Sequence, residues 1–311
     1  MRFTLFVLGI GLVGCVAADD TRATSQDIIG GEMANPADFP SVVALEDTPG
    51  NWFCTGTLIT PEWVLTAAHC TDGASAATLH IKFGDPDVNT AAGGIAVAVA
   101  EIHSHPDFDY DAWDNDIALV KLAAPSDRTP TPINRDQVAT DTDVLDVGYG
   151  VADNNDNGAG LLRKVAKVTA DCGGAGDAGI TNTNLVCMDA SDGRGSCFGD
   201  SGGPTFATIN SAKVVVGVTS GGTGDACGAG WDLYTSVHGE LDFIDGVLGG
   251  LTPPDPDPTD PDPTPDPDPT DPDPEDGGGD DGGSSGGCNA GGSAGLALAF
   301  AAGLLRRRRR R

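Results

Sequence analysis

Three short segments of the sequence contain residue types that together could activate a nucleophile. The first reads Thr-Ala-Ala-His-Cys and places His69 at the end of an apolar run. The second reads Asp-Asn-Asp-Ile-Ala-Leu-Val and places Asp116 just before another apolar run, whereas Ser201 lies in the segment Gly-Asp-Ser-Gly-Gly-Pro. A serine hydroxyl needs an imidazole base at neutral pH, and that imidazole needs a carboxylate to fix its tautomer. The combination predicts nucleophilic catalysis by a serine.

Short apolar runs of β type, separated by Gly, Pro, Asn and Asp clusters, must position these side chains. Helical spacing is found at 234–248, where Val237, Leu241, Ile244 and Val247 share one face. The sequence therefore predicts an all-β, barrel-type domain with one C-terminal helix. The expected strands are 41–45, 55–59, 63–67, 78–83, 95–102, 117–122, 143–148, 163–168, 185–188, 214–219 and 231–236.

The composition narrows the classes of function. The chain has 311 residues, with 17 Lys+Arg against 46 Asp+Glu, so its formal net charge is −29. Such acidity argues against a nucleic-acid partner, because phosphate binding needs clustered cations. The hydrophobic fraction of 39% is still large enough for a core, and 45 Gly with 21 Pro disfavour a helical bundle. We expect a soluble β-rich domain with a solvated acidic surface.

Residues 1–18 have the pattern of a secretory signal peptide: one basic residue, an apolar stretch and then small residues. Within this segment, Leu-Val-Gly-Cys resembles a bacterial lipobox, in which Cys15 would be lipidated after cleavage. The alternative is ordinary cleavage after Ala18, which would discard Cys15. Residues 19–27 are then expected to be a propeptide.

The other end of the chain is predicted to be a spacer followed by an attachment signal. Residues 249–287 are rich in Asp-Pro and Thr-Pro units and then in Gly, which predicts an extended, disordered linker rather than a calcium site. Residues 288–311 contain Cys288, a short apolar helix and six arginines, and they resemble the C-terminal surface-sorting signal of myxobacteria. In that case a sorting protease cuts at Cys288, which is then lipidated. The alternative is a plain anchor helix with its arginines in the cytoplasm.

Cysteine usage agrees with export. Six cysteines remain between the two processing segments, and an even number in an exported domain indicates disulfides, with 15 possible pairings. They show no Cys-x-x-Cys pairs of a zinc site. These cysteines are Cys54, Cys70, Cys172, Cys187, Cys197 and Cys227.

Over residues 28–248 the chain resembles the chymotrypsin/trypsin-type serine proteases, through the three segments above and the sequence Ile-Ile-Gly-Gly at 28–31. The resemblance implies two six-stranded antiparallel β-barrels with the active site between them. It implies His69 as general base and acid, Asp116 as the orienting carboxylate and Ser201 as nucleophile, with protein or peptide substrates.

The same resemblance implies further roles. The backbone NH groups of Gly199 and Ser201 would form the oxyanion hole. Cleavage before Ile28 would create an amine that pairs with Asp200, so the uncut chain would be a zymogen. Because Asp27 and not Arg or Lys precedes the cut, a protease other than trypsin, or an unusual self-cleavage, would have to activate it. The implied disulfides are Cys54–Cys70, Cys172–Cys187 and Cys197–Cys227.

The specificity pocket departs from trypsin. Gly195 stands where trypsin-like pockets have an aspartate, whereas Asp232 lies near the back of the pocket and Gly221 matches a wall glycine. Asp232 could be accessible and attract Lys or Arg, or it could be covered, leaving a pocket for small aliphatic side chains. The missing floor carboxylate favours the second interpretation.

Two other functional classes compete with a surface-attached, secreted endopeptidase. A catalytically silent relative could act as a displayed binding or adhesion module, but such relatives lose triad or activation residues, and all are present here. A non-proteolytic α/β-hydrolase would need the chain order Ser, Asp, His. His103 and His105 lie near carboxylates, yet we expect no metal there and no cofactor. The only membrane contact expected is through the terminal anchor.

Overall fold

The structure is a computed structural model that describes residues 28–90, 93–176, 180 and 182–249. The expected signal peptide at 1–18, propeptide at 19–27 and sorting segment at 288–311 lie outside the described residues, as do both terminal cysteines. Residues 250–287 of the expected linker also lie outside them. In the described part of the chain, no helix has the length and apolar character that a membrane crossing needs.

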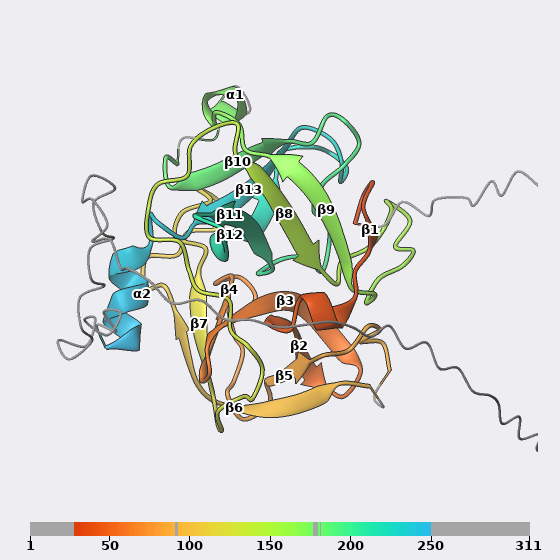
Figure 1. The fold of residues 1–311 in the computed structure, drawn as a ribbon, viewed down its shortest axis with the longest axis vertical. Helices are drawn as coiled ribbons and strands as arrows, with labels where there is room; N and C mark the ends of the chain where they lie inside the picture. The colour runs from red at the N-terminus through yellow and green to blue at the C-terminus, as the bar shows by residue number, and fades with distance from the viewer. Residues whose placement is uncertain (1–27, 91–92, 177–179, 181, 250–311) are drawn as a thin grey trace, which may run out of the picture. The chain divides into compact units, whose positions relative to one another are not determined.

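Six antiparallel strands of the N-terminal half close into a barrel in the order β2-β3-β4-β7-β6-β5 (Figure 1). Runs rich in Val, Ile, Leu and Thr favour strands, and closure removes the unpaired edges of a sheet. This barrel is one of the two that were expected. Its strands are β2 Val42–Thr48, β3 Asn51–Thr60, β4 Trp63–Thr66, β5 His80–Phe83, β6 Ile95–Ser104 and β7 Ala118–Leu122.

The C-terminal half forms a second sheet of seven strands in the order β1-β9-β8-β11-β12-β13-β10. The expected second barrel is therefore a half-barrel, and within the described residues its end strands β1 and β10 do not pair with each other. Over the described residues, the all-β fold with one helix of about two turns at its C-terminal end is confirmed. The strands are β1 Glu32–Met33, β8 Asp143–Gly148, β9 Arg163–Val168, β10 Leu185–Asp189, β11 Pro204–Ile209, β12 Ala212–Gly222 and β13 Trp231–Ser236.

Some elements differ from the sequence-based expectation. Strand β11 was not expected, because it begins at Pro204 directly after a glycine-rich loop; proline is tolerated as the first residue of a strand. The helix α2 covers only Leu241–Leu248 and ends at Gly249, which has a left-handed φ of 76°. Tyr234 had helical spacing but pairs with Thr219 in the sheet. Two short helices were also not expected, η1 Pro36–Asp38 and α1 Gly173–Gly176.

A shared hydrophobic core joins the two sheets. Leu45 and Leu119 of the barrel, Phe206 and Val218 of the second sheet and Ile244 of α2 belong to one cluster of buried side chains. Because protein interiors are close-packed, this core holds the strand ends of both sheets in a fixed relation. The loops that carry the candidate site residues start from those ends.

Candidate active site

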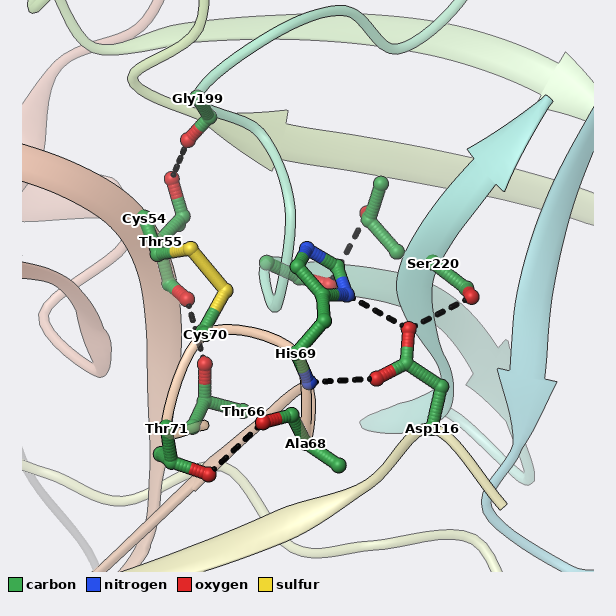
Figure 2. Close-up of a disulfide and its surroundings, with 12 residues drawn as sticks. Cys54, Thr55, Thr66, Ala68, His69, Cys70, Thr71, Asp116, Gly199 and Ser220 are labelled. Carbon is green, nitrogen blue, oxygen red and sulfur yellow. Dashed lines mark hydrogen bonds and ion pairs between the residues drawn. A yellow bond between two sulfur atoms is a disulfide. The ribbon is translucent and has the colours of Figure 1, made fainter. Parts of the chain in front are cut away.

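His69 lies just beyond the end of β4, in a turn that is tied to the neighbouring strand. Its neighbour Cys70 forms a disulfide with Cys54 of β3, and the hydroxyl of Thr71 donates a hydrogen bond of 2.9 Å to the carbonyl of Ala68 (Figure 2). The side chain of His69 is 21% exposed. The imidazole is thus held by its backbone and still open to a substrate.

Asp116 lies immediately before β7 and holds His69 at two points. Its Oδ1 accepts the backbone NH of His69 at 2.9 Å, and its Oδ2 lies 2.7 Å from His69 Nδ1. The hydroxyl of Ser220 donates a third hydrogen bond of 2.7 Å to Oδ2, as Figure 2 shows. Since an ionised carboxylate only accepts, Nδ1 carries the proton and Nε2 is left as the basic nitrogen.

A second contact fixes the backbone of Asp116 between the two sheets. The hydroxyl of Thr235 on β13 donates to the carbonyl of Asp116 at 2.9 Å, and Asp116 itself is 1% exposed. Ser220 and Thr235 both come from the second sheet, whereas His69 and Asp116 come from the barrel. The orientation of the imidazole therefore depends on the packing of the two sheets.

Ser201 belongs to the loop before β11 and faces the same cavity as His69. The cavity has a volume of about 430 Å³. The carbonyl of Ser201 accepts the backbone NH of Thr55 on β3 at 2.9 Å, which ties the loop to the barrel. In this described part of the chain, no hydrogen bond joins the Ser201 and His69 side chains; such bonds often tighten only when a substrate binds.

The loop before β11, which contains Ser201 and is called the nucleophile loop below, requires a glycine at position 199. Gly199 has a left-handed φ of 94°, and a Cβ there would lie 2.5 Å from the ring of Trp52. Its carbonyl accepts the hydroxyl of Thr55 at 2.8 Å, and the carbonyl of Phe198, in the same peptide as the Gly199 NH, accepts the NH of Val151 at 2.9 Å. Within the described residues, the backbone NH groups of Gly199 and Ser201 donate to no protein acceptor. Both donors are available to a bound ligand.

Asp232 occupies the place that the missing floor side chain would need. A Cβ on Gly195 would lie 1.9 Å from Asp232 Oδ2, so the glycine and the aspartate fit together. Oδ2 accepts the backbone NH of Ser196 at 3.0 Å, and both residues line the cavity beside Ser201. Burial raises the pKa of Asp232 to about 7, and the negative charge of Asp146 adds to this.

Trp113, which the sequence analysis did not single out, fills the wall next to Gly221. A Cβ on Gly221 would lie 2.0 Å from the Trp113 ring, so only glycine leaves room for it. Tyr110 lies beside it, with ring centroids 5.5 Å apart, and its ring meets that of His69 edge-on at 6.0 Å. These aromatic residues sit in an otherwise acidic loop, and no periodic pattern marks them.

Ile28 and Asp200, the expected activation pair, are both buried. Ile28 is 1% exposed, and the carbonyl of the following Ile29 accepts the NH of Gly195 at 2.9 Å. Asp200 accepts the NH groups of Gly150 at 2.7 Å and Cys197 at 2.9 Å. Burial nevertheless raises the pKa of Asp200 to about 7, and the negative charge of Asp146 adds to this, whereas the cation of Arg163 opposes it.

The six domain cysteines form the three disulfides that the resemblance implied. The bridges are Cys54–Cys70, Cys172–Cys187 and Cys197–Cys227. The last of these joins the nucleophile loop to a loop that lines the cavity.

No metal ligand set is formed by the candidate histidines. His69 lies within reach of the sulfurs of Cys54 and Cys70, but a disulfide has no thiolate to offer a metal. His103 lies 2.9 Å from Glu101, and His105 lies 3.6 Å from Glu240, so each contacts a different carboxylate.

Comparisons with known proteins agree with the geometry of the site. The family model described as trypsin matches residues 28–244. Brachyurin of Leptuca pugilator is 34% identical over 240 residues, which cover 73% of this chain and 100% of brachyurin. Trypsin Blo t 3 of Blomia tropicalis is 32% identical over 237 residues, 70% of this chain and 85% of that protein. The chain belongs to the trypsin family and is a serine endopeptidase that acts on proteins or peptides.

Proposed function

We propose that Ser201, His69 and Asp116 are the catalytic triad of this endopeptidase. The observation that carries the proposal is that two hydrogen bonds join His69 to Asp116, and that His69 lines the same cavity as Ser201. The Ser201 hydroxyl attacks the scissile carbonyl carbon while its proton passes to His69 Nε2. Collapse of the tetrahedral intermediate returns that proton to the leaving amine, and Asp116 stabilises the transient imidazolium. Water then repeats both steps on the acyl-enzyme, which releases the acid and restores Ser201.

The NH groups of Gly199 and Ser201 are proposed as the oxyanion hole. Both lack a protein acceptor in the described chain, and the 2.9 Å bond from the Val151 NH to the Phe198 carbonyl holds the peptide that carries the Gly199 NH. Donors that are already in place stabilise the charge that develops on the substrate oxygen, typically by 10²–10³ in rate for each donor.

Asp232 is proposed as the main determinant of specificity. The fit of its carboxylate against Gly195 and its place in the cavity wall favour the accessible interpretation over the small-aliphatic one that the sequence favoured. Above its pKa of about 7, the ionised Asp232 would bind Lys or Arg before the cut. Below that pH it would be neutral, and uncharged side chains would be accepted.

Activation is proposed to follow cleavage before Ile28. The buried Asp200 has two backbone donors but no described ion pair, and the glycines at 148 and 150 leave space around its oxygens. A new amine at Ile28 would supply the missing cation and order the loop that contains Gly199. The activating enzyme must accept Asp27 before the cut.

Secretion and attachment to the bacterial cell surface, at the outer membrane, are proposed from the sequence of both ends. The signal-like segment at 1–18 supports export, and the three disulfides are typical of an oxidising compartment. The Asp-Pro linker followed by Cys288 and six arginines supports C-terminal attachment through sorting, with Cys15 as a second possible lipidation site.

Labelling by a serine-directed fluorophosphonate tests the proposed nucleophile. We expect the chain that begins at Ile28 to be labelled at Ser201 and to cleave casein, and we expect Ser201→Ala to lose both. The matched control is Ser191→Ala, which changes an exposed serine outside the cavity. Labelling that survives Ser201→Ala would contradict the assignment. A cleaved chain with no label and no peptidase activity would instead favour the binding-module alternative.

A further inference from the structure

Asp146 is a buried carboxylate behind the specificity pocket that the proposed reaction does not use. It lies on β8 and is 2% exposed. Its Oδ1 accepts the hydroxyl of Thr205 on β11 at 2.5 Å, and its Oδ2 accepts the hydroxyl of Tyr234 on β13 at 2.7 Å. Burying a carboxylate is costly unless a cation pairs with it, and in the described part of the chain Asp146 has two hydroxyl donors and no ion pair. Its place behind the pocket therefore points to a role there.

Tyr234 connects Asp146 to the strand that carries Asp232. Its hydroxyl is bonded to Asp146, and it lies on β13 two residues after Asp232, so the two side chains are on the same face of the sheet. The backbone NH of Ser196 donates to Asp232 Oδ2 at 3.0 Å. Ser196 and Asp232 both line the cavity next to Ser201, whereas Asp146 does not. Tyr234 thus links Asp146, which lies behind the cavity wall, to the strand that carries Asp232, which lines the cavity.

The charges around Asp232 are few and come from four elements. Asp146 on β8 and Asp200 in the nucleophile loop raise the pKa of Asp232, whereas Lys167 on β9 lowers it. The ammonium group of Lys167 is already engaged, since it lies 2.9 Å from the carboxylate of Asp192. Tyr234, which lies on β13 with Asp232, is fully buried. Of the two acids, Asp146 is the one that the cleavage before Ile28 leaves unpaired.

We propose that Asp146 is a positioning residue of the specificity pocket, which controls through Tyr234 on β13 whether Asp232 meets the substrate as a charged or a neutral acid. The inference rests on the proposed role of Asp232. While Asp146 is ionised, its repulsion favours the neutral form of Asp232. The pocket then changes from uncharged to basic substrate side chains as the pH rises.

The test is a ratio of two substrates measured across pH. Two peptides that differ only by Arg or Leu before the scissile bond are cleaved by activated enzyme from pH 5.5 to 9, and kcat/KM is measured for each. Groups that both reactions share, such as His69, cancel in the ratio. We expect the Arg/Leu ratio of the wild type to rise at least tenfold with a midpoint near 7, where Asp232 ionises. In Asp232→Asn the ratio should not change with pH.

Asp146→Asn keeps the shape of the side chain and removes its charge. Because less repulsion lowers the pKa of Asp232, we expect the midpoint to move to lower pH by about one unit. Thr205→Val is the second variant, in case the first does not fold. It removes a donor that stabilises the ionised Asp146, so the midpoint should move in the same direction by a smaller amount.

The outcomes separate the inference from the proposed function. A midpoint that stays in place in the folded variants, while Asp232→Asn abolishes the pH dependence, would overturn the role of Asp146 alone. A ratio that is flat in the wild type and unaffected by Asp232→Asn would overturn the role of Asp232 and the inference with it. A loss of activity with an unshifted midpoint would assign Asp146 a structural role only.

Discussion

The closed barrel and the second sheet differ in how their buried carboxylates are stabilised. In the barrel, Lys82 Nζ lies 3.2 Å from Glu46 Oε1 and 3.1 Å from Asp85 Oδ2, and these three side chains are each 3% exposed. In the described part of the second sheet, Asp146 and Asp232 are as deeply buried but form no ion pair. Hydroxyl and NH donors stabilise their charge, and the more distant cation of Lys167 adds to this.

The difference follows what each sheet contributes to the proposed site. The barrel contributes His69 and Asp116, whose orientation must stay fixed in the proposed reaction. The second sheet contributes the loop of Ser201 and the pocket, which are proposed to change on activation and with pH. A paired charge is fixed, whereas a buried acid without a cation responds to any cation or proton that arrives. Asp146, Asp200 and Asp232 are therefore the groups that can be switched.

The largest expected effect is on kcat, when the charge of Asp116 in the barrel half of the site is removed. In Asp116→Asn the amide would stabilise the wrong tautomer of His69, so kcat should fall by a factor on the order of 10⁴. Steady-state kinetics on a peptide substrate measures this. Asp114→Asn is the matched control, because it makes the same change two residues away without contact to His69, and it should stay within a few-fold. A loss below tenfold in Asp116→Asn would contradict the assigned role.

Breaking the barrel's charge cluster should have the next largest effect. Lys82→Met leaves Glu46 and Asp85 buried without their cation, which should lower the free energy of unfolding by about 3–5 kcal/mol. Urea unfolding with the disulfides intact gives the value. Lys121→Met is the control, because its partner Glu101 is half exposed and the change should cost less than about 1 kcal/mol. Equal losses of unfolding free energy in the two variants would show that the buried cluster stabilises the protein no more than an exposed ion pair does.

The pH dependence of stability should reveal the unpaired acids of the second sheet. Burial raises the pKa of Asp146 to about 6 and those of Asp200 and Asp232 to about 7, against an ordinary value of 3.8. The folded state then binds more protons than the unfolded state between these values, so stability must fall as the pH rises through this window. Since each raised pKa contributes about 1.4 kcal/mol per pH unit, we expect uncut Ser201→Ala protein to lose about 3–7 kcal/mol between pH 5 and pH 8.

Cleavage before Ile28 is expected to reduce the dependence of unfolding free energy on pH. The new amine would pair with Asp200, so the cut protein should lose less stability over this pH range than the uncut protein. Urea unfolding of both forms at pH 5 and pH 8 makes the comparison. Stability that rises with pH in the uncut protein would contradict the proposed unpaired acids.

The smallest effect is expected where the two regions meet. Ser220→Ala removes one of three hydrogen bonds to Asp116 and leaves the other two, so kcat/KM should fall about tenfold, close to the value of one hydrogen bond to a charged group. Ser236→Ala, in the same sheet but without contact to Asp116, should have no measurable effect on kcat/KM. Identical kinetics for the two variants would mean that Ser220 does not help to hold the carboxylate.

Much of the fold could be predicted from local sequence. The ranges 143–148, 163–168 and 231–236 agree residue for residue with β8, β9 and β13, because turn residues bound each run clearly. Strand β11 was missed, since it begins at a proline after a glycine-rich loop, although it forms a hairpin with β12 and pairs with the distant β8. The start of α2 was misplaced because pairing in β13 overrides helical spacing.

The sequence alone determined which chemical groups are present: a histidine, an aspartate and a serine in a family pattern, six cysteines that can pair, and a glycine where a pocket aspartate was expected. Only the tertiary structure decided what each acid does. Asp116 and Asp232 have the same side chain, but Asp116 holds an imidazole whereas Asp232 is buried in a cavity wall near another negative charge. The reason is physical, since desolvation and neighbouring charge set the ionisation of a carboxyl group, and both arise from residues far away in the chain.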